Sequence, residues 1–301
     1  MSLIVLCGPT ATGKTKLALE LAERLGAEII SADSGQVYRG LDIGTAKPTP
    51  EERKKIPHHL IDLIEPPESF SAPLFAKKAD AALQEISSRG KRSLLVGGTG
   101  LYIRVFLEGI FEGPARNEEY RKKLELLKKE KGNGFLHQEL KRVDPKAAEK
   151  IHPNDPQRIV RALEVFHLTG KPISEWWEAS RGATRRAPTL KIGLTLEREE
   201  LYRRINERVL KMINAGWIGE VEGIIQKWGS NIPPLKLVGY REIAEYLKGK
   251  RGKEETISRI QQKTRNYAKR QLTWFRADKE IRWMNLSEIT EGFIRNSFLT
   301  R

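Results

Sequence analysis

Residues 3–15 read LIVLCGPTATGKT, a short apolar run followed by a glycine-containing loop and the start of a helix. The loop matches the pattern G-x-x-x-x-G-K-[ST] and lies between a predicted strand, Leu3–Cys7, and a predicted helix, Lys14–Leu25. In this context the loop amides and the helix N-terminus bind phosphates, the lysine contacts phosphate oxygens, and the threonine hydroxyl holds Mg²⁺. We therefore predict a diphosphate or nucleotide site, with a metal ligand at Thr15, made of Gly8, Pro9, Thr10, Ala11, Thr12, Gly13, Lys14 and Thr15.

Beyond this loop, short apolar runs alternate with helical segments. The runs at 28–31, 93–96 and 190–196 are predicted strands, and 73–88 is a predicted helix. Such alternation is typical of a parallel sheet with helices on both faces. Further helices are predicted at 198–215, 218–228, 240–248 and 253–276, followed by a strand at 281–284 and a terminal helix.

A charged segment interrupts the alternation after residue 112. It has helix starts at Asp144-Pro145 and Asp155-Pro156, since an aspartate cap followed by proline favours the first turn of a helix. The basic stretch 180–188 closes the segment. We therefore expect an α/β, P-loop NTPase-like body of parallel strands and flanking helices at 1–112 and 189–301, with a helical domain inserted at 113–188.

Composition bears on where the protein acts. No apolar run approaches the roughly 18 residues of a membrane span. The N-terminus has no cationic flank before its apolar run, so we interpret that run as a strand and not as a signal peptide. The single cysteine, Cys7, excludes an internal disulfide, and its place in the first strand predicts a buried side chain. These features favour a cytoplasmic protein without a membrane partner.

The net charge of +15 is unevenly distributed. The first 110 residues hold 14 Lys and Arg against 13 Asp and Glu, whereas the rest of the chain holds 40 against 26. An excess spread over so long a segment favours a large polyanion such as nucleic acid, although solvated helix faces are an alternative. The stretch 257–277 favours the former, because at helical spacing it has an acid-free cationic face of Arg259, Lys263, Arg265, Lys269, Arg270 and Arg276.

Two further strands end near the predicted loop. Asp33 follows the strand at 28–31, and the strand at 93–96 ends in Gly97-Gly98-Thr99-Gly100, with no acid. Because the carboxyl ends of the strands form the crevice of an open α/β sheet, Asp33 and Thr99 are expected to face the phosphates. A turn-capping role is the alternative for Asp33.

Seven motifs occur in a recognisable order. They read GPTATGKT, SADSGQVYRGLDIGTAKP, HHLID, LVGGTGLY, NDPQRIVRALEV, GYREIAEYL and TRNYAKRQLTWFR. Over nearly its whole length the chain resembles bacterial tRNA dimethylallyltransferases, also called tRNA isopentenyltransferases. The resemblance implies transfer of a dimethylallyl group from dimethylallyl diphosphate to N6 of the adenosine 3′ to the anticodon, in tRNAs that read codons beginning with U.

The resemblance also implies residue roles. Asp33 is implied as the general base, and Thr10, Lys14 and Arg208 as catalytic groups at the leaving diphosphate. The insertion is expected to clamp the anticodon stem-loop, and a monomer suffices for this. The implied tRNA contacts are Asp33, Ser34, Gly35, Gln36, Thr99, Arg121, Gln157, Arg158, Ile159, Val160 and Arg161, and the cationic stretch adds Lys263 and Lys269. One departure is Gly35, where the family usually has methionine, which puts side-chain contact at that position in doubt.

Alternatives remain open at this stage. The first hundred residues alone allow a P-loop kinase of a small metabolite, and a nucleotide-gated RNA-binding protein would also explain the charge. Packing or capping is favoured over metal binding for His58 and His59, because adjacent histidines are poorly placed to chelate one ion. The pair Trp176-Trp177 is expected in the core of the insertion more than in base stacking.

Overall fold

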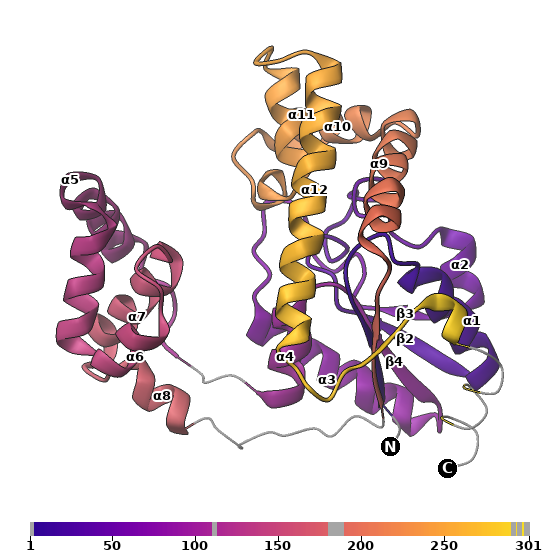
Figure 1. Ribbon diagram of the computed structural model, residues 1–301, viewed down its shortest axis with the longest axis horizontal. Helices are drawn as coiled ribbons and strands as arrows, with labels where there is room; N and C mark the ends of the chain where they lie inside the picture. Colours follow the sequence, from indigo (N-terminus) through magenta and orange to yellow (C-terminus); the bar gives the residue numbers. More distant parts are fainter. Residues whose placement is uncertain (1–2, 110–112, 180–189, 290–292, 294–296, 298–301) are drawn as a thin grey trace. The chain divides into compact units, whose positions relative to one another are not determined.

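The computed structural model describes residues 3–109, 113–179, 190–289, 293 and 297. The chain divides into two compact units, one of residues 1–106 with 187–301 and one of residues 107–186 (Figure 1). The predicted stretch 180–188 and nearly all of the predicted terminal helix lie outside the described residues. Within those residues no helix is long and apolar enough to cross a membrane.

The first unit is built on a parallel sheet. Its order within the described residues is β3-β2-β4-β1-β5-β6, and every neighbouring pair is parallel. All five residues of β1 are buried, which explains a strand that is apolar on both faces. The sequence did not predict β3, which has only two residues. The strands are β1 (Leu3–Cys7), β2 (Ala27–Ser31), β3 (His58–His59), β4 (Arg92–Val96), β5 (Leu190–Leu194) and β6 (Arg282–Met284).

Helices cover both faces of this sheet. The chain passes from β1 through α1 to β2 in one direction along the sheet and from β3 through α3 to β4 in the other. Because such crossovers are right-handed, α1 and α3 lie on opposite faces. The helices of this unit are α1 (Lys14–Leu25), α2 (Pro50–Lys55), α3 (Ala72–Ser88), α4 (Gly100–Glu108), α9 (Arg198–Asn214), α10 (Trp217–Trp228), α11 (Tyr240–Leu247) and α12 (Lys253–Arg276), with short 3-10 helices at Pro233–Lys236 and Leu286–Glu288.

Two large apolar clusters stabilise this unit. One packs α1 against β1, β4 and β5, with Leu21 fully buried at its centre. The other joins α9, α10 and α11 to the segment after β2, through side chains such as Val37 and Trp217. Cys7 is buried, as predicted, and burial raises the pKa of its thiol to about 12. The thiol is therefore protonated and acts as a small apolar group.

The second unit is helical. Asp144 and Asp155 cap α6 and α7 by accepting hydrogen bonds from Ala147 N and Arg158 N, so both predicted helix starts are confirmed. Trp176 and Trp177 pack against its core, as predicted. The helices of this unit are α5 (Glu118–Val143), with non-helical backbone at Gly132, α6 (Pro145–Lys150), α7 (Pro156–Thr169) and α8 (Ile173–Ala179).

Candidate active site

The phosphate loop leads from β1 into α1. Lys14, the first residue of α1, donates from Nζ to the carbonyl of Pro9 at 2.6 Å. Burial and, as a smaller effect, the charge of Arg208 from α9 lower the pKa of Lys14 to about 8. Burial also lowers the pKa of Arg208, whereas the carboxylate of Asp33 raises it. Two desolvated cations therefore lie near one acid, an arrangement that favours an anionic ligand.

Asp33 begins a tight turn directly after β2. Its Oδ1 accepts hydrogen bonds from Gly35 N at 2.8 Å and Gln36 N at 3.4 Å. Asp33 thus has the turn-capping role that we considered as an alternative to catalysis. The second carboxylate oxygen, Oδ2, takes part in neither bond. Capping therefore orients the carboxylate without using both of its oxygens.

Close approach explains the glycine at position 35. A Cβ there would lie 2.7 Å from Cγ2 of Thr45, so a side chain would require the Thr45 side chain to move. Gly35 contributes only backbone to the wall of the cavity described below. This answers the doubt about side-chain contact at this departure from the family pattern: in this chain the position offers none.

The end of β4 braces the same turn. Thr99 Oγ1 accepts a hydrogen bond from Ser34 N at 3.0 Å, and Thr99 N donates to the carbonyl of Ala32. Thr99 was expected to face the phosphates. Its hydroxyl is instead bonded to the acceptor turn, which we define as residues 33–36.

One cavity of about 480 Å³ brings most of these groups together. Thr10, Ala11, Gly13, Lys14 and Thr15 of the phosphate loop line it, and so do all four residues of the acceptor turn. Arg208 closes it from α9. The structure therefore gathers all four residues expected to be catalytic, from three separate parts of the sequence, around one space. The cavity lies entirely within the first unit.

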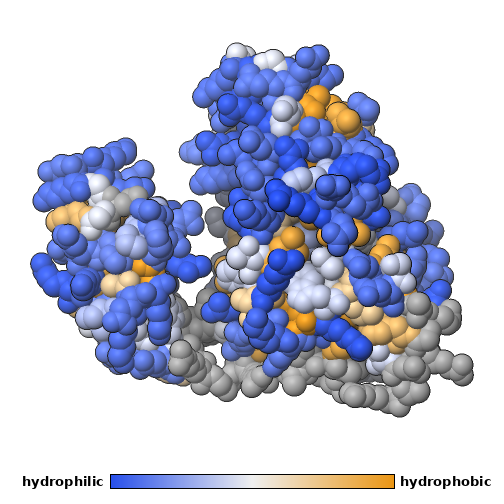
Figure 2. Space-filling view, viewed as in Figure 1, coloured by the Kyte–Doolittle hydropathy of each residue, from blue (hydrophilic) through white to orange (hydrophobic). Residues whose placement is uncertain are grey.

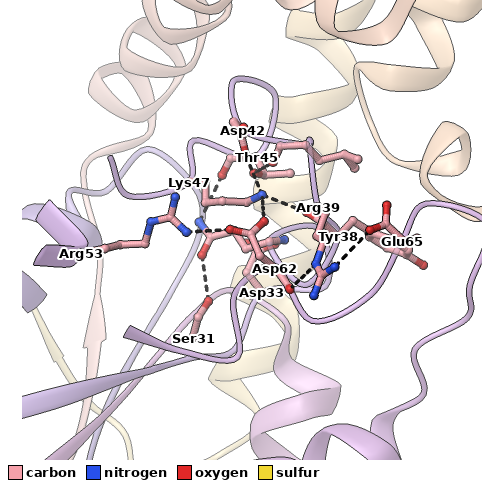
Figure 3. Close-up of polar contacts among 12 residues, drawn as sticks. Ser31, Asp33, Tyr38, Arg39, Asp42, Thr45, Lys47, Arg53, Asp62 and Glu65 are labelled. Atoms are coloured by element: carbon pink, nitrogen blue, oxygen red, sulfur yellow. Dashed lines mark hydrogen bonds and ion pairs between the residues drawn. The ribbon is translucent and has the colours of Figure 1, made fainter. Parts of the chain in front are cut away.

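A buried lysine holds the segment that follows the acceptor turn (Figure 3). Lys47 Nζ donates to the Tyr38 carbonyl at 2.9 Å, to Asp42 at 2.5 Å and to Asp62 at 2.6 Å. Arg53 pairs with the other oxygen of Asp62 at 2.6 Å. The three ammonium donors are thus matched by three acceptors, which allows a charge to be buried.

The acceptor turn is linked to this network through Gln36. Its Nε2 donates to the carbonyls of Thr45 and Ala46, each at 3.3 Å, and its Oε1 accepts from Ser31 at 2.8 Å. From the opposite side, Glu220 of α10 accepts hydrogen bonds from the amides of residues 42, 43 and 44. The loop that carries Thr45 is therefore fixed on both sides.

A family model described as IPP transferase matches residues 36–278. The tRNA dimethylallyltransferase of Geobacter metallireducens is 50% identical, over 94% of this chain and 92% of that protein. The chain belongs to the IPP transferase family. The tRNA dimethylallyltransferase of Carboxydothermus hydrogenoformans is 48% identical, with 99% of each chain covered.

Solved structures of similar proteins agree with this membership. The tRNA isopentenylpyrophosphate transferase of Bacillus halodurans is 41% identical, with a TM-score of 0.72 over 99% of this chain and 97% of that one. A eukaryotic dimethylallyltransferase described as acting on tRNA is 28% identical, with a TM-score of 0.78 over 98% of this chain and 80% of that one. The α/β fold expected from the sequence is thus that of the IPP transferase family.

Helix α12 supplies residues that the sequence did not predict in this cavity. Tyr267, Arg270 and Gln271 all line the cavity. In the sequence, Tyr267 and Gln271 recur at helical spacing with apolar residues such as Phe275, a pattern that predicts a packing face. Burial and the nearby Asp33 charge raise the pKa of the Tyr267 phenol. A packing face and a cavity wall have the same spacing in sequence, so periodicity could not separate them.

The cationic face of α12 is less uniform than expected. Lys263 and Lys269 are exposed, and hydrophilic residues cover much of this face of the unit (Figure 2). Arg265 instead donates to Asn206 Oδ1 of α9 at 2.7 Å. Arg259 pairs with Glu255 one turn earlier, so the face is not free of acids at its start.

In the helical unit, one carboxylate holds two of the expected tRNA contacts. Glu164, fully buried, accepts from Arg121 at 2.6 and 2.8 Å and from Arg161 at 2.6 Å. The bonds from these arginines and from Asn117 N outweigh the effect of burial and lower the pKa of Glu164 to about 2. Both arginines remain partly exposed.

The segment 157–161 shows two kinds of position. Gln157 and Arg158 are exposed, and Val160 is half-buried. Ile159 is fully buried in the core of the unit, so the expected tRNA contact from its side chain is wrong. A helix must bury one face, and here that face includes the middle of the motif.

Proposed function

We propose that this chain is a tRNA dimethylallyltransferase, which moves a dimethylallyl group from dimethylallyl diphosphate to an exocyclic adenine amine in tRNA. Relatives that match over nearly their full length have that name. The finer assignment is N6 of the adenosine 3′ to the anticodon, in tRNAs that read codons beginning with U. It rests on the resemblance of the motifs.

The observation that carries this proposal is a single cavity lined by both anion-binding groups and a carboxylate. Lys14, Arg208, the phosphate loop and Asp33 all line it. A transferase needs this combination, because it must stabilise a leaving diphosphate and accept a proton from the attacking amine in one place.

On the donor side of the reaction, the protein must stabilise the negative charge of the leaving diphosphate. As the allylic C–O bond breaks, its electron pair leaves with the diphosphate, and negative charge grows on the leaving group. Lys14, Arg208 and the amides at the start of α1 are the groups proposed to stabilise that charge, and their partial burial strengthens the interaction.

On the acceptor side, a group of the protein must remove a proton from the adenine amine. The adenine N6 lone pair forms the new C–N bond, and the amine must then lose a proton. Asp33 is the proposed acceptor, with Oδ2 taking the proton because Oδ1 caps the turn. A carboxylate suffices, since an alkylated amine is strongly acidic at the moment of transfer.

Mg²⁺ fits the residues at the loop. Thr15 lines the cavity next to Lys14, and it offers the hydroxyl oxygen that a P-loop metal uses. Mg²⁺ commonly binds only one or two protein groups and takes its remaining ligands from waters and substrate phosphates. We infer that Thr15 holds the ion together with the diphosphate. When bound, the ion adds positive charge at the leaving group.

tRNA recognition is assigned to both units. Lys263 and Lys269 on α12 are proposed to contact phosphates, and the acceptor turn to contact the target nucleotide. A base must leave its stack to enter such a cavity. The helical unit is proposed to hold the anticodon stem-loop through Gln157, Arg158 and Arg161.

The test is transfer itself. tRNA, Mg²⁺ and dimethylallyl diphosphate are incubated with the protein, and the nucleosides are analysed by mass spectrometry. An adenosine that gains one dimethylallyl group supports the proposal. Unmodified tRNA contradicts it, and phosphate transfer from ATP to a small acceptor in a parallel reaction indicates the metabolite kinase instead.

A further inference from the structure

A buried glutamine on α12 joins the two sides of the cavity. Gln271 is 5% exposed, and both ends of its amide are bonded. Its Oε1 accepts from Thr10 N at 2.9 Å, and its Nε2 donates to the carbonyl of Gly98 at 2.9 Å. The orientation of the amide is fixed by these partners, because a backbone N–H can only donate and a carbonyl can only accept.

The two partners belong to different halves of the site. Thr10 lies in the phosphate loop, which holds the leaving group under the proposed function. Gly98 immediately precedes Thr99, whose hydroxyl accepts the hydrogen bond from Ser34 in the acceptor turn. A short chain of bonds therefore runs from the phosphate loop through Gln271 to the turn that carries Asp33.

The fit around Gln271 is close. A Cβ at Gly98 would lie 2.2 Å from Nε2 of Gln271, and a Cβ at Gly100 would lie 2.2 Å from Trp274 of the same helix. Gly98 and Gly100 of the motif LVGGTGLY therefore let α12 approach the end of β4. Phosphate binding alone does not explain them.

The bond to Thr10 also changes the account of the phosphate loop. All the loop amides were expected to surround the diphosphate, but Thr10 N already donates to Gln271. Removing the glutamine would leave this amide without its partner and would allow the loop to rotate. An unpaired, partly buried amide is unfavourable, so the loop would settle in another geometry.

We propose that Gln271 is a positioning residue for group transfer, which holds the phosphate loop and the Thr99-braced acceptor turn at a fixed separation. This inference rests on the proposed function, because it assigns the donor to one partner of Gln271 and the acceptor to the other. Both ends of its amide are bonded to the protein backbone, so its proposed role is to position the groups that bind the two substrates. It sets the approach of the two substrates, where a misplacement of about 1 Å can cost roughly 100-fold in rate.

The experiment compares Gln271→Met and Gln271→Glu with a matched control, Gln261→Met. Gln261 lies on the same helix and donates to the carbonyl of Asn206 in α9 at 3.3 Å, away from the cavity. For each full-length variant, circular dichroism checks folding, gel shift gives tRNA affinity, and single-turnover transfer with saturating substrates gives the rate.

We expect Gln271→Met to bind tRNA like the wild type but to transfer about 10–100-fold more slowly. Gln261→Met should keep the wild-type rate. Gln271→Glu should regain rate at low pH, because a protonated carboxyl group both donates and accepts as the amide does. That gain should disappear as pH rises and the group ionises, since a carboxylate cannot donate to Gly98 and repels the diphosphate.

Three outcomes would overturn the inference: a wild-type rate in Gln271→Met, an equal loss in Gln261→Met, or a Gln271→Glu rate that never exceeds that of Gln271→Met. If Gln271→Met does not fold, the Gln271→Glu pH profile against the wild-type profile decides alone. Absence of transfer by the wild type would instead refute the proposed function, so the two failures are distinguishable.

Discussion

Replacing Lys47 by methionine should destabilise the first unit strongly. The side chain of Lys47 is 1% exposed, and its Nζ donates hydrogen bonds to the Tyr38 carbonyl and to the carboxylates of Asp42 and Asp62 (Figure 3). Methionine fills a similar volume but offers no donor. The substitution thus removes three charge-assisted bonds while leaving all three acceptors in place.

The expected loss of unfolding free energy depends on whether each acceptor finds water or another cation once Lys47 is replaced. Breaking a buried ion pair by removing one partner costs about 3–5 kcal/mol. Asp42 reduces this figure because its side chain is 62% exposed and water can solvate it, and Asp62 keeps Arg53. The Tyr38 carbonyl loses its charged donor. We therefore expect a loss of about 2–3 kcal/mol, which lowers the melting temperature by about 4–12 °C in a unit of this size.

Calorimetry of Lys47→Met against Lys54→Met checks this value. Lys54 is an exposed lysine on the adjacent α2, so its replacement removes the same charge without a buried site. The control should melt within about 1 °C of the wild type, as surface substitutions usually do. A Lys47→Met protein that melts with the control would refute the reasoning, because the buried charge would then contribute nothing to stability.

Three further predictions concern the reaction and the RNA surface. Asp33→Asn should keep the turn, because an asparagine oxygen can still cap it, and it should keep the affinity for tRNA. The single-turnover rate should nevertheless fall by about 10²–10⁴-fold, whereas a wild-type rate would exclude a general base at this position. Because the pKa of Lys14 is lowered to about 8, kcat/KM for dimethylallyl diphosphate should fall as the pH rises above that value. If kcat/KM of a Lys14→Met enzyme falls in the same way, another group is responsible for the pH dependence. Lys263→Ala and Lys269→Ala should each make the plot of log affinity for tRNA against log salt shallower by about 0.7, whereas unchanged slopes would identify solvated surface.

Local signals predicted the backbone of this fold well. Helices α1 and α12 and strand β1 have the predicted bounds, and the other elements whose bounds were predicted differ by one or two residues at their ends. The reason is that the residues at a helix end largely determine where the helix begins and ends. Gly26 in the left-handed region ends α1, and Asp155 with Pro156 begins α7. Helices α2 and α4 were not predicted. The short strand β3 was missed because two residues paired with β2 carry no periodicity of their own.

Site residues were predicted where a motif is associated with a known role for the residue. The phosphate loop, Asp33 and Arg208 do line one cavity. Gln271 and Lys47 were missed because their partners are distant or are backbone atoms: Gln271 bonds to a loop 261 positions earlier. Likewise, Ile159 could not be recognised as buried from its motif, because which face of α7 packs depends on the other helices of the unit.

Nucleoside mass spectrometry of tRNA from a single incubation tests the central claim most directly. The tRNA is taken from cells that lack the modification and is treated with wild-type protein, Mg²⁺ and dimethylallyl diphosphate. The account predicts one dimethylallylated adenosine per substrate tRNA, and almost none with Asp33→Asn in the same time. Unmodified tRNA with the wild-type protein, or product formed equally fast by the variant, would contradict it.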